Sequence, residues 1–173
     1  MSGNTVRIRE YESEDYAVVR TLFTNGLIKL VYPKGFDIQP YISESLNTDL
    51  STIESTYLEE DGSNFWVAVA DDVIIGMTAI KKITVDTAEL RRMSVSESSR
   101  RSSVASNLLK TAEIFCINHE YDFLRLTTTT VQIPAIRLYQ KNGFEEYDRT
   151  VHGLITAVHF KKALPTTQFT ESA

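Results

Sequence analysis

The loop ESSRRSSVA, residues 97–105, lies between a strand-like run, AELRRMSV, and a helix-like run, SNLLKTAEIFCINHEYDF. A strand that enters a helix through a short polar loop is a common phosphate site, because the first N–H groups of a helix have no partner within it. Such loops usually contain glycine, whose backbone turns onto an anion at no steric cost. This loop has none. The sequence therefore predicts a phosphate site built from serine and arginine.

A second segment, LTTTTVQIPAIRLYQKNGF (126–144), also runs from a strand into a helix. Its β-branched start is typical of a strand. Pro134 suits the first turn of a helix, and Asn142-Gly143 supplies a left-handed stop. The two segments together predict a strand–helix–strand crossover whose strands are parallel.

Together the two segments resemble the acetyl-CoA-dependent N-acetyltransferases of the GNAT superfamily, and within it the camello-like branch. The phosphate motif of that family is Arg/Gln-x-x-Gly-x-Gly/Ala, which Arg100, Val104 and Ala105 fit, while Ser103 stands at the glycine position. The second motif is Gln-x-x-Ala-x-x-Leu-Tyr-x-x-x-Gly-Phe. It is matched by Gln132, Ala135, Leu138, Tyr139, Gly143 and Phe144. The likeness extends over residues 73–149.

The remaining sequence supplies the other elements of a mixed α/β fold. Alternating apolar residues predict strands at 5–11, 64–72, 73–83, 88–95, 123–131, 144–151 and 154–164. Asp71-Asp72 is a candidate for the tight turn of a hairpin between the second and third of these. Helical spacing predicts helices at 13–30, 104–119 and 133–143, with one or two more between 38 and 58. The order is β-α-α-β-β-β-α-β-α-β-β, a mostly antiparallel sheet flanked by helices. We expect one domain at 1–164 and a mobile tail at 165–173.

The resemblance implies acetyl-CoA as co-substrate. Its pyrophosphate would lie on the backbone of the loop, and its pantetheine arm along the preceding strand. The residues implied are Met93, Ser94, Val95, Arg100, Arg101, Ser102, Ser103, Val104, Ala105, Gln132 and Tyr139. Two geometries are open at Ser103. A right-handed backbone accommodates serine, whereas a positive φ would strain it by about 1 kcal/mol, which glycine would relieve.

Acetyl transfer to an amine also needs groups that move protons. The resemblance implies that the Tyr139 hydroxyl faces the coenzyme sulfur and acts as the acid; the alternative is a core tyrosine. Glu89 is the candidate base, and the alternative is a surface Glu89–Arg91 ion pair. With period two, Glu89 shares a face with Arg91, Met93 and Val95, unless a bulge intervenes.

Composition narrows the class of protein. The chain has 173 residues, 42% of them hydrophobic and 24% charged, with a formal net charge of −5, which disfavours a nucleic-acid partner. No apolar run is long enough to span a membrane, and the N-terminus lacks a secretory signal, so we expect a cytoplasmic protein. Cys116 lies in an apolar stripe and is expected in the core. The histidines, among them His152 and His159, show no metal-ligand spacing, so no metal is expected.

The resemblance implies an N-acetyltransferase that acts by direct attack of an amine on acetyl-CoA. The acceptor amine stays open: a small molecule, an amino-acid conjugate or a protein amine. The alternative is a non-catalytic acyl-CoA-binding or protein-interaction module, because the phosphate loop has no glycine. The sequence does not indicate an oligomeric state.

Overall fold

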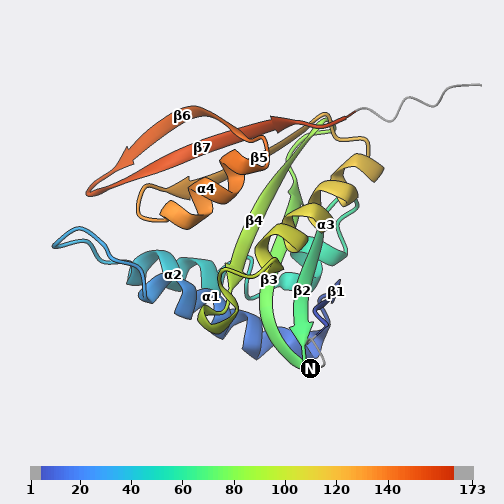
Figure 1. The fold of residues 1–173 in the computed structure, drawn as a ribbon, viewed down its shortest axis with the longest axis horizontal. Helices are drawn as coiled ribbons and strands as arrows, with labels where there is room; N and C mark the ends of the chain where they lie inside the picture. Colours follow the sequence, from blue (N-terminus) through green and yellow to red (C-terminus); the bar gives the residue numbers. More distant parts are fainter. Residues whose placement is uncertain (1–4, 166–173) are drawn as a thin grey trace, which may run out of the picture.

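A computed structural model describes residues 5–165, and the last residues of the predicted tail, 166–173, lie outside the described part. The elements follow the predicted order, so the mixed α/β fold is confirmed (Figure 1). They are β1 (Arg7–Glu10), α1 (Tyr16–Ile28), α2 (Gln39–Asn47), β2 (Asn64–Ala70), β3 (Val73–Lys82), β4 (Thr87–Val95), α3 (Val104–Asn118), β5 (Phe123–Thr129), α4 (Ile133–Lys141), β6 (Glu145–His152) and β7 (Ile155–Ala163). A single π-helical turn at Glu54–Leu58 is all that forms of a second helix between 48 and 58.

Two turns form as their residue types predict. Asp71 and Asp72 join β2 to β3 with φ of 48° and 61°, the left-handed conformation that a two-residue hairpin needs and that aspartate tolerates. Gly143 has φ of 82° and ends α4, where Asn142 Nδ2 donates to the Leu138 carbonyl at 2.8 Å. The hairpin turn fixes where β3 begins, and the end of α4 fixes where β6 begins.

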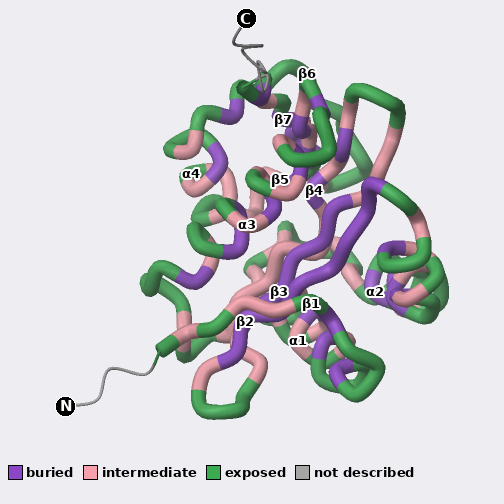
Figure 2. The backbone as a smooth tube through the Cα atoms, turned by 90° about the vertical axis from the view of Figure 1, so that its right-hand side faces the viewer, coloured by how far each residue is buried: buried purple, intermediate pink, exposed green. Residues whose placement is uncertain are grey.

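The sheet has two covered faces. β2 alternates between them: Trp66 and Ala68 pack in one apolar cluster with α3, and Phe65 and Val67 pack in the other. The first cluster also takes residues from α4 and β7; the second takes them from α1, α2 and the 54–58 turn. Figure 2 shows β2 and β3 buried between the layers. Cys116 is fully buried as predicted, and burial raises the pKa of its thiol to about 12, so it is no nucleophile at neutral pH.

The seven-stranded sheet opens in its middle. The strand order is β1-β2-β3-β4-β5-β7-β6, and only β4 and β5 are parallel. Their pairing runs from Thr87–Phe123 to Leu90–Leu126 and stops there, although both strands continue. Beyond that point β5 pairs only with β7, and Figure 1 shows β4 and β5 diverging, with α4 in the opening. The opening exposes backbone groups on the facing edges of two strands.

A β-bulge at Arg92 reverses the faces of β4. The β3–β4 register shifts between Met77–Ser94 and Ala79–Arg91, so Arg92 and Met93 together lie opposite Thr78. Ala88 and Leu90 face α3 before the bulge, and Met93 and Val95 face the same cluster after it. The expectation that Glu89 shares a face with Met93 and Val95 is therefore wrong. The extra residue, with φ of 56°, changes the phase of the alternation.

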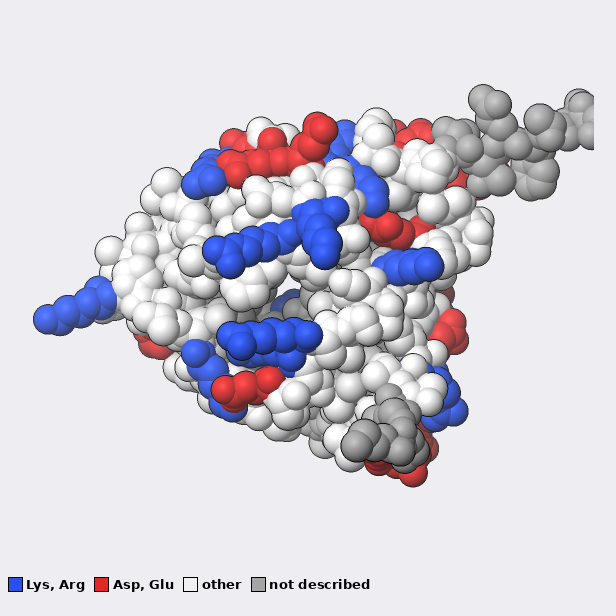
Figure 3. Space-filling model, viewed as in Figure 1, with Lys and Arg blue, Asp and Glu red and all other residues white. Residues whose placement is uncertain are grey.

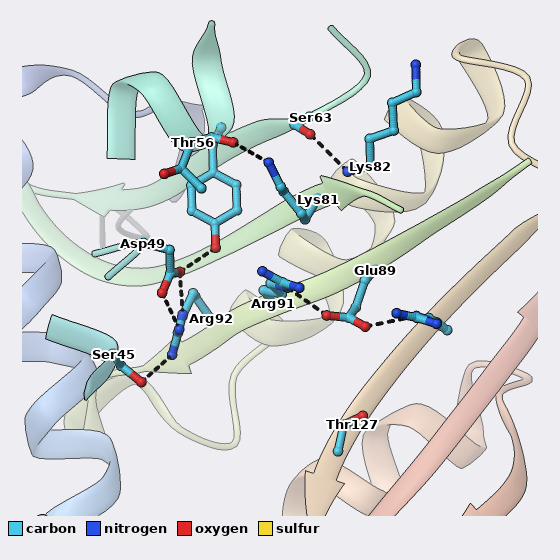
Figure 4. Close-up of polar contacts among 12 residues, drawn as sticks. Ser45, Asp49, Thr56, Ser63, Lys81, Lys82, Glu89, Arg91, Arg92 and Thr127 are labelled. Carbon is cyan, nitrogen blue, oxygen red and sulfur yellow. Dashed lines mark hydrogen bonds and ion pairs between the residues drawn. The ribbon is translucent and has the colours of Figure 1, made fainter. Parts of the chain in front are cut away.

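A buried ion pair holds the bulge. Arg92 Nε and Nη2 donate to the two carboxylate oxygens of Asp49 at 2.8 and 2.5 Å, and Ser45 and Tyr57 complete the cluster (Figure 4). Burial alone would raise the pKa of Asp49, but the hydrogen bonds and charge of Arg92 outweigh it and leave that pKa below its ordinary value. The pair ties β4 to the segment after α2.

Within residues 5–165, no helix is long and apolar enough to cross a membrane.

Candidate active site

The strained residue of the phosphate loop is Arg101. Ser103 has φ of −76°, an ordinary right-handed value, so of the two geometries left open by the sequence the unstrained one is present. Arg101 instead has φ of 62°, which an L-residue adopts at a cost of about 1–2 kcal/mol. Arg100 before it is extended, with φ of −67°. The left-handed residue of this loop is therefore Arg101, two residues before Ser103, which stands at the glycine position of the motif.

The loop presents backbone donors at the start of α3. Among the described residues, no hydrogen bond takes up the N–H groups of Arg101, Ser102, Ser103 and Ala105. The N–H of Val104 reaches only the Ser102 hydroxyl, at 3.5 Å. Free donors at a helix N-terminus attract an anion, and the helix dipole adds to the attraction. The arrangement therefore fits a pyrophosphate, although the contact itself stays a prediction.

Basic and acidic side chains border the loop. Lys29, at the end of α1, pairs with Glu97 at 2.6 Å, and both side chains are largely exposed. A small cleft between α1 and the loop is lined by Leu22, Asn25, Gly26, Lys29, Val95, Ser96, Glu97 and Arg100. Arg100 thus lies beside the predicted cradle with its side chain exposed. The cleft links the loop to the end of β4.

β4 presents an open edge to the predicted pantetheine arm. Ser94 and Val95 pair with Met77 and Gly76 of β3 on one side. On the other side β5 has already diverged. A strand with one unpaired edge binds an extended amide chain by adding it as a neighbour. Met93, Ser94 and Val95 therefore stay the predicted pantetheine site.

Tyr139 lies on α4 with only 5% of its surface exposed. Its ring contacts Phe144 edge-on, with centroids 5.8 Å apart, and its hydroxyl makes no hydrogen bond with any described residue. Burial raises the pKa of the phenol above its ordinary value, so it keeps its proton at neutral pH. A buried, protonated and unpartnered hydroxyl suits a proton donor. The acid role itself stays a prediction.

Gln132 is engaged within the protein. Its Oε1 accepts a hydrogen bond from the Thr128 hydroxyl at 2.7 Å, which ties the start of α4 to β5. This contact explains the glutamine without coenzyme. Its predicted contact with the coenzyme stays open.

Glu89 lies between two arginines. Arg91 Nε donates to one carboxylate oxygen at 2.6 Å and Arg125 Nε to the other at 2.9 Å (Figure 4). The ion pair with Arg91 that the sequence offered as the alternative role is present, and Arg125, 36 residues away, joins it. A carboxylate held by two guanidinium groups is well placed to orient them. The base role of Glu89 stays a prediction.

A polar face that sequence reasoning missed extends from Glu89 across the sheet. Leu124, Leu126 and Phe160 are buried towards α3, so Arg125, Thr127 and His159 lie on the opposite face. His159 Nδ1 lies 2.9 Å from the Thr127 hydroxyl, and Nε2 lies 2.8 Å from that of Thr150. The alternation in LITAVHFKKAL is the signal that could have placed His159 on this face.

Loops border this face at one end. The Leu154 side chain, in the β6–β7 turn, lies 3.8 Å from where a Cβ on Gly35 would be, so this turn meets the α1–α2 connection. Figure 3 shows Lys and Arg side chains above and below a hollow near the centre of its view. Within residues 5–165, no group of acidic, histidine and cysteine side chains could hold a metal ion. The described site thus consists of an anion cradle, an open strand pair and a polar face.

Comparison with known proteins assigns this arrangement to a family. The acetyltransferase (GNAT) family matches residues 32–144. Mouse N-acetylaspartate synthetase is 35% identical over 144 residues, covering 79% of this chain and 48% of that protein. Human N-acetyltransferase 8 is 30% identical over 139 residues, covering 74% of this chain and 61% of that protein. The chain thus spans about half the length of the synthetase it matches.

Solved structures share the fold. A GNAT-family acetyltransferase from Staphylococcus aureus superposes with a TM-score of 0.78 at 20% identity, over 93% of this chain and all of that one. PaiA N-acetyltransferase from Thermoplasma acidophilum, solved in complex with coenzyme A, gives 0.74 at 21% identity, over 92% of this chain and 99% of that one. At these identities the likeness concerns the fold alone.

The loop geometry predicts opposite effects of glycine at two neighbouring arginines. Arg101→Gly should raise the free energy of unfolding by about 1 kcal/mol without ligand, because it relieves the positive φ. Arg100→Gly should lower it, since the backbone there is extended and glycine only loosens the unfolded chain. Urea unfolding measures both. A destabilised Arg101→Gly would contradict the assignment of strain to that residue.

Proposed function

The chain belongs to the acetyltransferase (GNAT) family, and we propose that it moves an acetyl group from acetyl-CoA to a primary amine by direct attack. The observation that carries the proposal is the parting of β4 from β5 beside a helix start with free N–H donors. The loop would hold the pyrophosphate, and the open edge of β4 would hold the pantetheine arm. This places the thioester between the two strands, where an amine can reach it from the polar face.

Two protons must move in this reaction. The amine nitrogen forms a bond to the carbonyl carbon and loses a proton, and the C–S bond breaks to release a thiolate that gains one. We assign the second step to Tyr139, whose hydroxyl keeps its proton at neutral pH because burial raises its pKa. Holding amine and thioester together supplies much of the rate.

We propose an acidic amino acid, such as aspartate, as the acceptor. One similar protein is named N-acetylaspartate synthetase, and Arg91 and Arg125 lie together on the polar face. Their side chains are 34% and 38% exposed, so both guanidinium groups retain donors for a substrate. With Glu89 the group carries a net charge of +1, which favours an anionic acceptor. Guanidinium groups bind carboxylates by paired hydrogen bonds.

An acetyl-transfer assay tests the proposal directly. We expect acetyl-CoA to be consumed fastest with L-aspartate or L-glutamate, and slowly with their amides, because the amides lack side-chain charge for the arginines. Thiol release measures turnover, and calorimetry measures CoA binding.

The outcomes separate the alternatives. CoA binding and a raised melting temperature without transfer to any amine would favour the non-catalytic module. Absence of CoA binding at millimolar concentration would contradict the assignment of the cradle. Transfer to uncharged amines only would contradict the proposal of an acidic acceptor, but it would still support the proposed acetyltransferase activity.

Tyr139→Phe should lower kcat by about 10²-fold or more, because the ring stays and the proton donor is lost. CoA affinity and melting temperature should change little, since the hydroxyl has no partner in the described protein. Steady-state kinetics with calorimetry measure both. A variant with normal kcat would make Tyr139 a packing residue.

Arg125→Gln should raise KM for aspartate by about 10- to 100-fold with little change in kcat, because a charged hydrogen bond to the acceptor is lost. The matched control is Lys161→Gln, on the same face opposite Arg125. Its ammonium lies over the Phe123 ring, 3.7 Å from the centroid, so we expect a smaller effect. Equal effects of both variants would indicate a general charge effect only.

A further inference from the structure

We propose that His159, reached through the Thr127 hydroxyl, takes the proton that the acceptor amine releases. The inference rests on the proposed acetyl transfer and assigns the proton transfer that Tyr139 does not serve, the loss of a proton from the amine. Both oxygens of Glu89 already accept guanidinium hydrogen bonds, whereas the two ring nitrogens of His159 lie within hydrogen-bond distance of the Thr127 and Thr150 hydroxyl groups. An imidazole also changes its charge between about pH 5 and 8, where such an enzyme works.

Thr127 lies at the edge of the opening in the sheet. Leu126, just before it, is the last residue of β5 that pairs with β4. Thr127 is exposed, and it points to the face of Glu89 and Arg125 (Figure 4). In the proposed reaction, Arg91 and Arg125 hold the amine while it attacks the thioester between β4 and β5. The amine therefore lies beside the Thr127 hydroxyl. His159 stands directly behind it on β7.

Each ring nitrogen of His159 has one partner. The relay requires the tautomer in which Nδ1 accepts from the Thr127 hydroxyl and Nε2–H donates to Thr150 Oγ1, and both contacts allow it. The charged and titratable groups around it are Arg125 on β5, Lys161 on β7, and Asp148 and Tyr147 on β6. Asp148 is its register partner, and the Tyr147 ring centroid lies 6.1 Å away.

The step balances in atoms and charge. The acceptor binds as a free amine, and its nitrogen attacks the thioester carbonyl carbon. As the N–C bond forms, the amine proton passes to Thr127 Oγ1 while the Thr127 hydroxyl proton passes to His159 Nδ1. The C–S bond breaks, and the sulfur takes the Tyr139 proton. Products are the amide and CoA thiol, and solvent returns the imidazolium proton to the tyrosinate.

The pH–rate profile tests the relay. With acetyl-CoA and the fastest acceptor of the amine panel, and with the acceptor concentration counted as free amine, His159→Gln should lower kcat/KM by about 10²-fold at neutral pH and remove the acid limb between about pH 5 and 8. Glutamine still bonds to hydroxyls but takes no proton. Thr127→Val should have the same effect, while Thr127→Ser should keep both rate and limb.

Two controls make the result specific. His152→Gln alters the exposed histidine at the end of β6 and should leave the profile unchanged. Glu89→Gln should keep the acid limb. If His159→Gln keeps a wild-type profile, the relay is overturned. If Glu89→Gln alone removes the limb, the relay is overturned and Glu89 is the base. A wild-type chain that acetylates nothing contradicts the proposed function before any variant is made.

A readout independent of turnover is the tautomer of His159. ¹⁵N NMR of the imidazole, with CoA added, should show Nδ1 unprotonated and Nε2 protonated in the neutral ring. Thr127→Val should shift the Nδ1 signal, and His152→Gln should not. A ring protonated at Nδ1 could not accept the Thr127 proton and would overturn the proposal.

Discussion

The ion pair between Arg92 and Asp49 is the constraint on which the site depends. Arg92 holds a positive φ that costs about 1–2 kcal/mol in an L-residue, and it does so inside a strand. The Arg92 side chain is 12% exposed and the Asp49 side chain 11%, so water solvates neither charge well enough for it to be stable without its partner. Breaking such a pair costs about 3–5 kcal/mol, more than the strain. The pair therefore keeps the bulge in place.

The bulge separates two roles along one strand. Before it, Glu89 and Arg91 face the polar side, and after it Met93 and Val95 face α3. A regular strand would have put all four side chains on the same face. The bulged strand instead presents charged side chains on one face before the bulge, and an apolar face with a free backbone edge after it. In the proposed reaction one strand can thus border both substrates, because its phase changes between them.

Sequence patterns predicted the elements because their signals are local. The aspartates of the β2–β3 turn, the glycine after α4 and the stripe of α3 each depend on neighbours a few residues away. The bulge, the place of β7 between β5 and β6, and the pairing of Arg125 with Glu89 depend on contacts far along the chain. The period-two alternation of a strand does not predict a bulge when no residue type in the sequence indicates the extra residue. The same limit applies to Arg101, because no glycine in the loop sequence indicates that a residue there has a positive φ.

The alternation of β5 and its neighbours puts the proposed proton donor and the proposed proton acceptor on opposite faces of the sheet. Thr128 and Tyr139 belong to the face of α4, while Thr127 and His159 lie on the other. A thioester between β4 and β5 has access to both faces, because these strands no longer pair there. The nitrogen that loses a proton and the sulfur that gains one can then be served from opposite sides of the sheet. Where paired strands close a sheet, the two faces have no such common point, so in the proposed reaction the opening brings the two proton transfers to the two reacting bonds of one carbonyl carbon.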